Sequence, residues 1–426
     1  MKWDVEQATL EDSQRFENIN GLWTGKKAPF VEVGVIRNTN FTESGRIDYS
    51  NVARLQVEQK KLEKRQLRMG DIIVERSGGG PKQPVGRVVY FEREDGPFSF
   101  SNFTSAIRVR DRNVFDSKFV FYRLLELYQS GRTEDIQRRT TGLRNLDFSA
   151  YKERACFPLI PLSEQYKIAG VLGVVQQAIE QQERLIALTT ELKKALLHKL
   201  FTQGLRGETQ KQTEIGPLPE SYEVVRISDL FKFSSGKKRP GDTEAEWSAS
   251  KPFPVYGGNG ILGYSSEFLL ESPVLVLGRV GEYCGCAHHT QGKAWISDNA
   301  LYPKKTSPRI NTRWAAEYLT YANLNQYSSR AGQPLITQGV IGEVKMPLPL
   351  IGEQDEMTTA FSELNRKLDV HRRKHGTLTD LFRTLLHQLM TAQIRVHDLD
   401  LDGILSQVVR ENGDKQSPGL QSPLDK

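Results

Sequence analysis

The sequence has few cysteines, no long apolar run and little excess of either charge. Three cysteines in 426 residues, at positions 156, 284 and 286, cannot form a disulfide framework, and this favours a reducing compartment. The segment Met1 to Leu10 mixes charged and polar side chains, so we expect no secretion signal. No apolar stretch approaches the roughly 20 residues of a membrane-spanning helix. These absences predict a cytoplasmic protein without a membrane partner.

Several catalytic motifs are also missing. The sequence has no Pro-Pro dipeptide, which excludes the [Asn/Asp]-Pro-Pro-aromatic loop of amino-methyltransferases. It has no Gly-x4-Gly-Lys-[Ser/Thr] phosphate loop, which excludes the usual ATP-driven motor. No Pro-Asp dipeptide begins an acidic cluster of the nuclease type. We therefore expect the chain to be non-catalytic by itself.

What is present suits a soluble protein with more than one domain. The chain has 38% hydrophobic and 26% charged residues, and its length exceeds that of a typical single domain. The net charge of +6 and the pI near 9.0 are compatible with an anionic partner but are too small to prove one.

An internal repeat determines the expected architecture. The 49 residues from Pro158 align without a gap with the 49 residues from Pro347, and 13 positions are identical. The clearest matches are Glu-Gln at 164–165 with 353–354 and Leu-Leu-His at 196–198 with 385–387. One duplicated unit, with a variable part followed by a repeated part, covers most of the chain.

Both repeated segments are predicted to be long helices. Their apolar residues alternate by about four and three, which is the pattern of a coiled-coil seam. A polar layer, with His371 and His375 in the second copy, interrupts this seam. Two ordinary surface helices on separate domains are the alternative. The predicted seam consists of Ile168, Leu172, Val175, Ile179, Ile186, Leu196, Leu200, Met357, Phe361, Leu364, Leu368, Leu378, Phe382, Leu385 and Leu389.

The segments before each helix have short β-branched and aromatic runs between glycines and prolines, which is typical of α+β globules. Strands are expected at 31–36, 71–75, 86–91, 273–278 and 294–296, and short helices at 119–128 and 312–324. The expected boundaries are 1–157 for the first globule, 158–207 for the first spacer helix, 208–350 for a polar linker and the second globule, 351–396 for the second spacer helix, and 397–426 for a partly disordered tail.

This organisation resembles the specificity subunit of type I restriction–modification enzymes over residues 1–395. The motifs that carry the resemblance are the Pro-Leu…Glu-Gln openings at 158–165 and 347–354, the stretch 216–230 followed by Ser-Gly-Lys-Lys-Arg-Pro, and Tyr256-Gly-Gly-Asn-Gly-Ile-Leu-Gly-Tyr264 with its continuation to Trp295-Ile-Ser-Asp-Asn-Ala300.

The resemblance implies an α+β fold with two target recognition domains, joined by two long helices in an antiparallel coiled coil with a pseudo-two-fold repeat. It implies that each domain reads half of a split site in double-stranded DNA, and that the helices set the spacing and dock two methyltransferase subunits. Restriction subunits join where the system cuts DNA. S-adenosylmethionine, ATP and Mg are then expected in partner subunits, with no cofactor in this chain. A bipartite type II specificity subunit and a coiled-coil protein adaptor are the alternatives.

Candidate DNA contacts are donors on glycine-loosened loops. Arginine suits guanine and glutamine suits adenine in the major groove, whereas clustered cations suit phosphates. Flexible turns with solvated charges are the alternative. In the first globule the candidates are Arg37, Asn38, Asn40, Arg76, Ser77, Gly79, Lys82, Gln83, Arg138, Arg139 and Arg144. In the second globule they are Lys237, Lys238, Arg239, Tyr256, Asn259, Arg279, Arg330 and Gln333.

No metal site is expected. Cys284 and Cys286 precede His288 and His289, but alternate side chains of a strand point to opposite faces. The i, i+4 histidines of the second repeated helix fall on the seam, where a polar layer that fixes the helix register explains them better.

Overall fold

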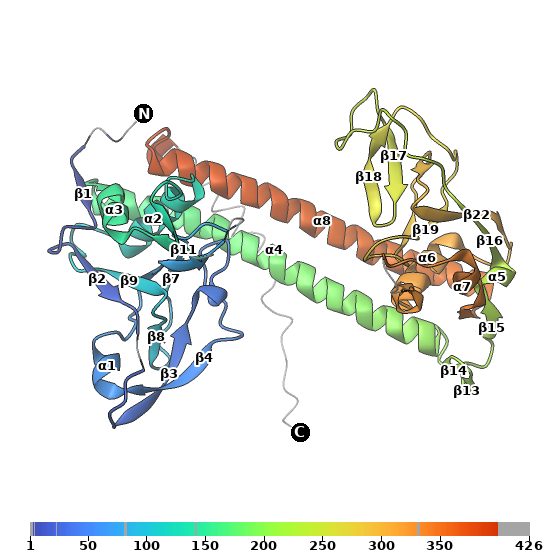
Figure 1. Cartoon of the computed structure of the whole chain (residues 1–426), viewed down its shortest axis with the longest axis horizontal. Coiled ribbons are helices and arrows are strands. Elements are labelled where there is room, and N and C mark those ends of the chain that lie inside the picture. Colours follow the sequence, from blue (N-terminus) through green and yellow to red (C-terminus); the bar gives the residue numbers. More distant parts are fainter. Residues whose placement is uncertain are drawn as a thin grey trace, which may run out of the picture. The chain divides into compact units, whose positions relative to one another are not determined.

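The computed structural model describes residues 3, 5–22, 24–80, 83–140, 143–329 and 333–398. The chain divides into two compact units, residues 1–181 with 374–426 and residues 182–373 (Figure 1). We call the part of each unit outside the long helices α4 (Leu162–Gln203) and α8 (Ile351–Met390) its globule. Among the described helices, none has the length and apolar character needed to cross a membrane.

The first globule is built around a four-stranded antiparallel sheet in the order β2-β9-β5-β7. A three-stranded sheet, β4-β3-β8, contains one parallel pair, and β10-β11-β6 and β1-β12 complete the strands. The strands are β1 (Gln7–Thr9), β2 (Phe16–Asn20), β3 (Phe30–Ile36), β4 (Ala53–Glu58), β5 (Ile72–Glu75), β6 (Ser77–Gly79), β7 (Val88–Tyr90), β8 (Phe98–Phe100), β9 (Thr104–Val109), β10 (Gln137–Thr140), β11 (Leu143–Leu146) and β12 (Cys156–Pro158). The helices are α1 (Gln59–Glu63), α2 (Ser117–Gln129) and α3 (Phe148–Arg154).

The second globule repeats this arrangement. Its four-stranded antiparallel sheet has the order β16-β22-β19-β20, and its three-stranded sheet β18-β17-β21 again contains one parallel pair. The strands are β13 (Gln210–Thr213), β14 (Gly216–Pro219), β15 (Glu223–Arg226), β16 (Phe231–Ser235), β17 (Phe253–Gly257), β18 (Gly260–Ser265), β19 (Leu275–Gly278), β20 (Ala287–His289), β21 (Trp295–Ile296), β22 (Ala300–Thr306) and β23 (Lys345–Leu348). The helices are α5 (Ile227–Leu230), α6 (Thr312–Tyr321) and α7 (Gln338–Glu343).

The two faces of each four-stranded sheet are covered in the same way. Successive strand residues point to opposite faces. In β5, Ile72 and Val74 join the cluster that contains α2, whereas Ile73 joins the cluster that contains β3 and β8. In β19, Leu275 and Leu277 pack in the cluster of α6, and Val276 packs with residues of β17 and β21. The predicted mixture of strands and helices with a long helix pair is confirmed.

In each unit, part of α4 packs against part of α8 (Figure 1). In the second unit, Gln182 contacts His371 at 2.9 Å, and the Leu205 amide donates to the Glu353 carboxylate at 2.9 Å. The residue number rises along α4 while it falls along the facing segment, so the two helix segments of this unit run in opposite directions.

Most of the predicted seam residues are buried, but two positions are shifted by one residue. Leu196 and Leu385 are only half-buried, whereas their neighbours Leu197 and Leu386 are buried. Ile186, Leu364 and Leu378 are also half-buried. An α-helix has 3.6 residues per turn, so a strict 3.5-residue pattern drifts around a straight helix. Where a helix packs against a globule, the buried face therefore differs from that pattern.

One buried glutamine ties each globule to a long helix, and the two glutamines make equivalent hydrogen bonds. In the first unit the Gln165 side chain accepts from the Asp116 amide at 2.9 Å and donates to the Val114 and Ile160 carbonyls at 2.7 and 2.9 Å. Gln165 is 0% exposed. The bonds reach the residue that caps α2, so they fix the start of that helix.

In the second unit Gln354, at the equivalent repeat position, is also 0% exposed. Its side chain accepts from the Asn311 amide at 2.8 Å and donates to the Arg309 and Pro349 carbonyls at 2.9 and 2.8 Å. Asn311 caps α6 as its counterpart caps α2. We call each set of three bonds a glutamine clamp.

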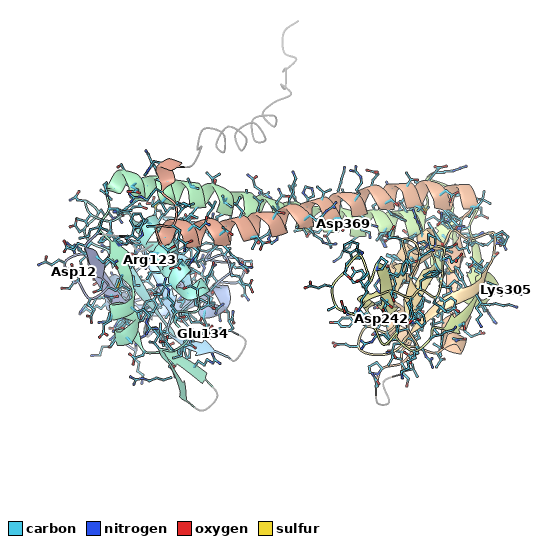
Figure 2. All side chains as sticks on the ribbon, turned by 90° about the horizontal axis from the view of Figure 1, so that it is seen from above. Asp12, Arg123, Glu134, Asp242, Lys305 and Asp369 are labelled. Carbon is cyan, nitrogen blue, oxygen red and sulfur yellow. The ribbon has the colours of Figure 1, made fainter. Side chains whose placement is uncertain are left out.

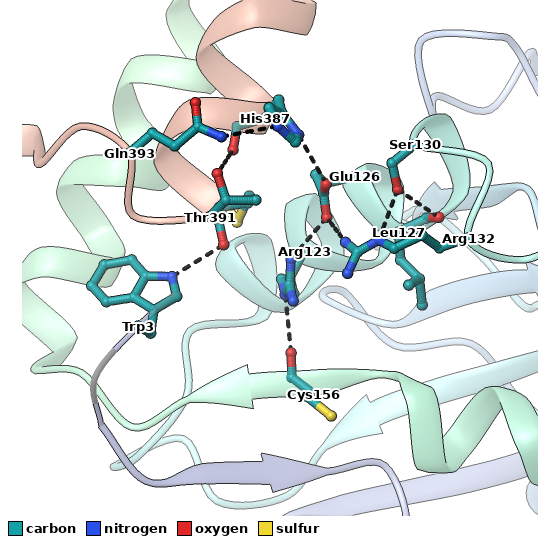
Figure 3. Close-up of polar contacts among 11 residues, drawn as sticks. Trp3, Arg123, Glu126, Leu127, Ser130, Arg132, Cys156, His387, Thr391 and Gln393 are labelled. Carbon is teal, nitrogen blue, oxygen red and sulfur yellow. Dashed lines mark hydrogen bonds and ion pairs between the residues drawn. The ribbon is translucent and has the colours of Figure 1, made fainter. Parts of the chain in front are cut away.

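The C-terminal end of α8 closes the core of the first unit (Figure 3). The Trp3 indole donates to the Met390 carbonyl at 3.1 Å, and Arg395 lies over the indole ring at 4.8 Å. Arg395 also pairs with Glu164, the residue beside the glutamine clamp. The buried Glu126 carboxylate pairs with Arg123 at 2.8 Å and with Arg132, and it contacts the His387 ring at 3.2 Å.

Two expectations about loops are corrected. The segment expected to be a polar linker forms a hairpin, in which β13 pairs with β14. Cys284 and Cys286 do not lie in a strand, because the chain turns there and β20 begins at Ala287. The tail from residue 399 lies outside the described residues.

Candidate nucleic-acid interface

In the first globule, two of the predicted DNA-contacting segments meet beyond the end of β5. β6 pairs with β11, and β11 pairs with β10, so residues 77–79, 137–140 and 143–146 join one small sheet. The Ser77 hydroxyl donates to Asn145 at 2.5 Å across this sheet. We call this sheet and the adjoining strand ends the first rim.

A buried ion pair forms the base of the first rim. The Glu75 side chain is fully buried and receives two hydrogen bonds from Arg87, at 2.8 and 2.9 Å. Asn38 donates to Glu75 at 3.2 Å, and Gly78, with φ +110°, passes so close that a Cβ would lie 2.5 Å from the Asn38 amide nitrogen. This pair is neutral as a whole and therefore supports the rim instead of offering charge to a ligand.

Two predicted contacts of the first globule are corrected to structural roles. Asn40 is 2% exposed, and its amide donates to the Asp48 and Asn51 carbonyls at 3.1 Å. Its Oδ1 accepts from the Arg37 amide at 2.9 Å, so it holds a turn. Gly79 is buried as well, because the backbone of the following hairpin covers it.

Other candidates of the first rim remain accessible. Arg138 is exposed and pairs with Asp147, Arg144 is half-buried, and Gln83 is exposed. Lys82 lies outside the described residues, as does the side chain of Arg139.

In the second globule the corresponding segments also converge at the end of the central strand. Arg279 follows β19, and its Nη1 donates to the Ser235 hydroxyl at 2.9 Å. The Gly236 backbone passes so close to the Ile296 carbonyl that a Cβ would lie 2.2 Å from its oxygen. Lys237 then forms an isolated bridge with Ser297. We call this region, with Ser329 and the segment 333–335, whose Leu335 bridges Val280, the second rim.

The cationic run of the second rim faces solvent. Lys237, Lys238 and Arg239 are all exposed. The following Asp242, labelled in Figure 2, accepts from the Ser265 hydroxyl at 2.6 Å and from the Ser266 amide at 2.9 Å. These bonds lower the pKa of Asp242 to about 2, so it stays ionised and ties the run to β18.

Tyr256 is corrected from a DNA contact to a core residue. It is 6% exposed and packs with Val276 and Ile296. Asn259, in the turn between β17 and β18, is exposed. Gln333 is exposed as well, and Arg330 lies outside the described residues.

Some features of the rims could not be predicted from the sequence. Asn20 and Ser105 each accept a hydrogen bond from Arg76, at 3.1 and 3.3 Å, although they are far from it in sequence. Two aromatic side chains of the second globule, Trp247 and Tyr283, are more than half exposed, at 62% and 54%. Only the unusual exposure of a large aromatic, which a sequence does not reveal, marks them.

The cysteine and histidine cluster of the second globule forms ordinary contacts. Cys284 is buried, and its carbonyl accepts from the Asn325 amide at 2.9 Å. His289 bonds the Thr312 hydroxyl at 2.9 Å. Within the described ranges, no three His, Cys, Asp or Glu side chains form a group that could hold a metal ion.

The chain is similar to known specificity subunits. The family described as "Type I restriction modification DNA specificity domain" matches residues 219–379. The MjaVIII specificity subunit of Methanocaldococcus jannaschii is 23% identical over 70% of this chain and 75% of that protein. The EcoprrI specificity subunit of Escherichia coli is 26% identical over 61% of this chain and 66% of that protein. The crystal structure of the type I system S subunit from M. genitalium shares the fold, with a TM-score of 0.63 at 18% identity over 91% of this chain and 97% of that one.

Proposed function

We propose, from the premise that this chain belongs to the specificity subunits of type I restriction–modification enzymes, that its two globules each read one half of a split DNA site. The observation that carries the proposal is the strand order that the two globules share, with a polar, cation-bearing rim beyond the central strand of each. Two readers with one fold and different side chains suit two unlike half-sites.

Within each rim we assign exposed and half-buried donors to DNA. The sequence candidates that keep this assignment are Arg37, Asn38, Arg76, Ser77, Gln83, Arg138 and Arg144 in the first rim, and Lys237, Lys238, Arg239, Asn259, Arg279 and Gln333 in the second. The adjacent cations of 237–239 suit the phosphate backbone, since point charges on a solvated loop position a protein without reading bases.

The long helices form an antiparallel coiled coil with a pseudo-two-fold axis at its centre. Gln182 and His371 are equivalent positions of the repeat, 189 residues apart, and they contact each other at 2.9 Å. In an antiparallel pair of equivalent segments, a residue meets its own counterpart only at the two-fold axis. The matched glutamine clamps give each half the same attachment to its globule.

A pseudo-two-fold chain offers two equivalent surfaces for two methyltransferase subunits. Leu192 and Leu381 are equivalent repeat positions, and both are exposed, at 57% and 44%. Specificity subunits are non-catalytic parts of a larger complex, so methyl transfer with S-adenosylmethionine, and any ATP- and Mg-dependent cutting, belong to partner subunits. A bipartite type II assembly would use this chain in the same way, whereas a protein adaptor would leave the cationic rims unexplained.

Lengthening the spacer tests the proposal. Seven residues inserted into each helix, beside Gln182 and beside His371, keep the apolar stripes in register and add about 10 Å, or roughly 3 base pairs. We expect the methylated-adenine motif, mapped in a host with and without this gene, to keep both half-sites and gain about this spacing. An insertion into the β13–β14 turn is the control and should leave the motif unchanged. If the spacing between the half-sites did not change in the helix variant, the proposal that the helices set this spacing would be wrong.

A further inference from the structure

The two rims contain arginines at the same position of the shared fold. In the first globule the ladder aligns Asn20 with Ser105 and Ser105 with Val74. Arg76 lies two residues beyond Val74. These registers fix the position of Arg76 relative to three neighbouring strands.

In the second globule the ladder aligns Ser235 with Leu301 and Leu301 with Leu277. Arg279 lies two residues beyond Leu277. Arg279 therefore occupies the position that Arg76 occupies in the first globule.

The backbone bonds of the two arginines agree with this register. The Arg76 amide donates to the Phe103 carbonyl at 2.8 Å, and the Arg279 amide donates to the Asn299 carbonyl at 2.9 Å. Both acceptors lie two residues before the strand residue that the ladder aligns, Ser105 or Leu301.

The carbonyl groups are matched as well. The Arg76 carbonyl accepts from the Leu146 amide at 2.8 Å, and the Arg279 carbonyl accepts from the Ile336 amide at 3.0 Å. Each donor directly precedes the residue that caps a short helix, α3 or α7. Equivalent backbone bonds on both sides place the two side chains at the same site of each globule.

The side chains are held by equivalent neutral acceptors. Arg76 Nη1 donates to Asn20 Oδ1 at 3.1 Å, and Arg279 Nη1 donates to Ser235 Oγ at 2.9 Å. Asn20 and Ser235 are the last residues of the equivalent strands β2 and β16. The Phe148 ring also lies 4.6 Å from the Arg76 guanidinium.

Neither arginine has a counter-ion among the described residues. Within the described part of the chain, no carboxylate lies within 4.0 Å of either guanidinium, although both side chains are half-buried. The partly buried arginines 87, 108 and 123, by contrast, pair with Glu75, Asp71 and Glu126. Burial lowers the pKa of Arg76, but an arginine remains charged at neutral pH. A half-buried cation that has neutral hydrogen-bond partners but no carboxylate among the described residues suits an acceptor that arrives from outside.

We propose that Arg76 and Arg279 are equivalent base-reading residues and that each contacts a guanine in its own half-site. This inference rests on the proposed function. One nitrogen of each guanidinium is tethered, so the plane is fixed while other N–H groups remain free for the two acceptors, O6 and N7, on the major-groove edge of guanine. A loosely held surface cation would suit a phosphate instead.

The test maps methylated adenines in cells that express the full chain with its methyltransferase subunits. In Arg76→Gln we expect discrimination for guanine at one position of one half-site to fall roughly 5- to 150-fold, with the other half-site and the spacing unchanged. In Arg279→Gln we expect the same effect in the other half-site. Each variant is thus the control for the other.

Conservative variants keep the test informative if glutamine weakens folding. Arg76→Lys and Arg279→Lys keep the charge but lose the fork of donors, so guanine discrimination should still fall. The control Arg309→Gln removes an exposed arginine that pairs with Glu223 and should leave the motif intact.

The inference would be overturned if the glutamine and lysine variants kept the motif and methylated all sites more weakly. That result is expected if the arginines contact phosphates or only stabilise the fold. If the wild-type chain directs no bipartite motif at all, the proposed function fails, whatever the arginines do.

Discussion

Beyond the matched glutamine clamps, each globule contacts a long helix at a second pair of equivalent repeat positions, and there the chemistry differs between the two units. In the first unit the buried Tyr122 hydroxyl donates to Gln176 at 2.9 Å. Gln176 also donates to the Ser44 carbonyl at 2.6 Å, while Arg46 pairs with Glu180 on the same helix. The cavity beside these contacts has only about 50 Å³, and a larger cavity of about 720 Å³ lies further along the helix pair, where α8 contributes Arg383 and His387 to its lining.

In the second unit the junction is charged and open. Asn365, the equivalent of the glutamine in the first junction, donates to Glu317 at 2.8 Å, and Lys193 pairs with the same carboxylate at 2.8 Å. A cavity of about 580 Å³ lies beside them, and α8 contributes Asp369 to its lining (Figure 2). The comparison indicates that one helix position can anchor two globules whose contacting side chains have diverged.

The largest expected effect is a loss of stability on substitution of either clamp glutamine, and it should be equal in the two units. Gln165→Leu and Gln354→Leu each remove three buried hydrogen bonds and leave backbone groups unpaired, so each should cost about 3 kcal/mol or more of local stability. Hydrogen exchange resolved by segment should show the loss in the unit that carries the change. If only one of the two variants lost stability in its own unit, the two clamps would not be equivalent.

A smaller effect should separate the two junctions. Tyr122→Phe leaves the buried side chain of Gln176 without its donor and should cost about 1–2 kcal/mol. Glu317→Gln acts in a junction open to water and should cost less than about 1 kcal/mol. Thermal unfolding at low and at high salt would compare them. Adding salt should reduce the cost of the glutamate substitution alone, and equal salt dependence would contradict the contrast.

The smallest expected effect depends on pH and belongs to the second unit. Burial lowers the pKa of His288 and of His289, so the folded unit resists their protonation. Stability from these groups is full above the unfolded pKa of about 6.5 and is lost as the pH falls below it. Exchange measured between pH 7.5 and pH 5.5 should show faster opening in residues 182–373. The double variant His288→Gln/His289→Gln should lose this dependence, and an unchanged pH profile in that variant would refute the assignment.

The helices and strands could be predicted because their patterns are local. The two repeated segments align without a gap at a constant offset of 189 residues, so the repeat can be found in the sequence alone. The strand at 72–75 is buried on both faces and begins with three apolar residues, so its prediction needed only its own sequence. The seam residues Leu196 and Leu385 were misplaced by one position because packing against each globule, which is not a local property, selects the buried face.

The rims were predicted less well because tertiary contacts decide burial there. Tyr256 is covered by Val276 and Ile296, which are distant in sequence, and Asn40 is buried in a turn where its amide donates to the Asp48 and Asn51 carbonyls. The equivalence of Arg76 and Arg279 was also hidden. The strands that carry them are offset by 203 residues (279 − 76), whereas the helices are offset by 189, since the intervening loops differ in length.

The position of the Trp3–Met390 contact has a consequence for synthesis on the ribosome. The second unit is one continuous stretch, so its core is complete once residue 373 has emerged. The first unit needs Phe382, Leu386 and Leu389 to cover its core, although its globule is translated first. The globule that is made first therefore completes its core last, and nascent chains interrupted between residues 373 and 382 should contain a folded second unit and an incompletely folded first unit.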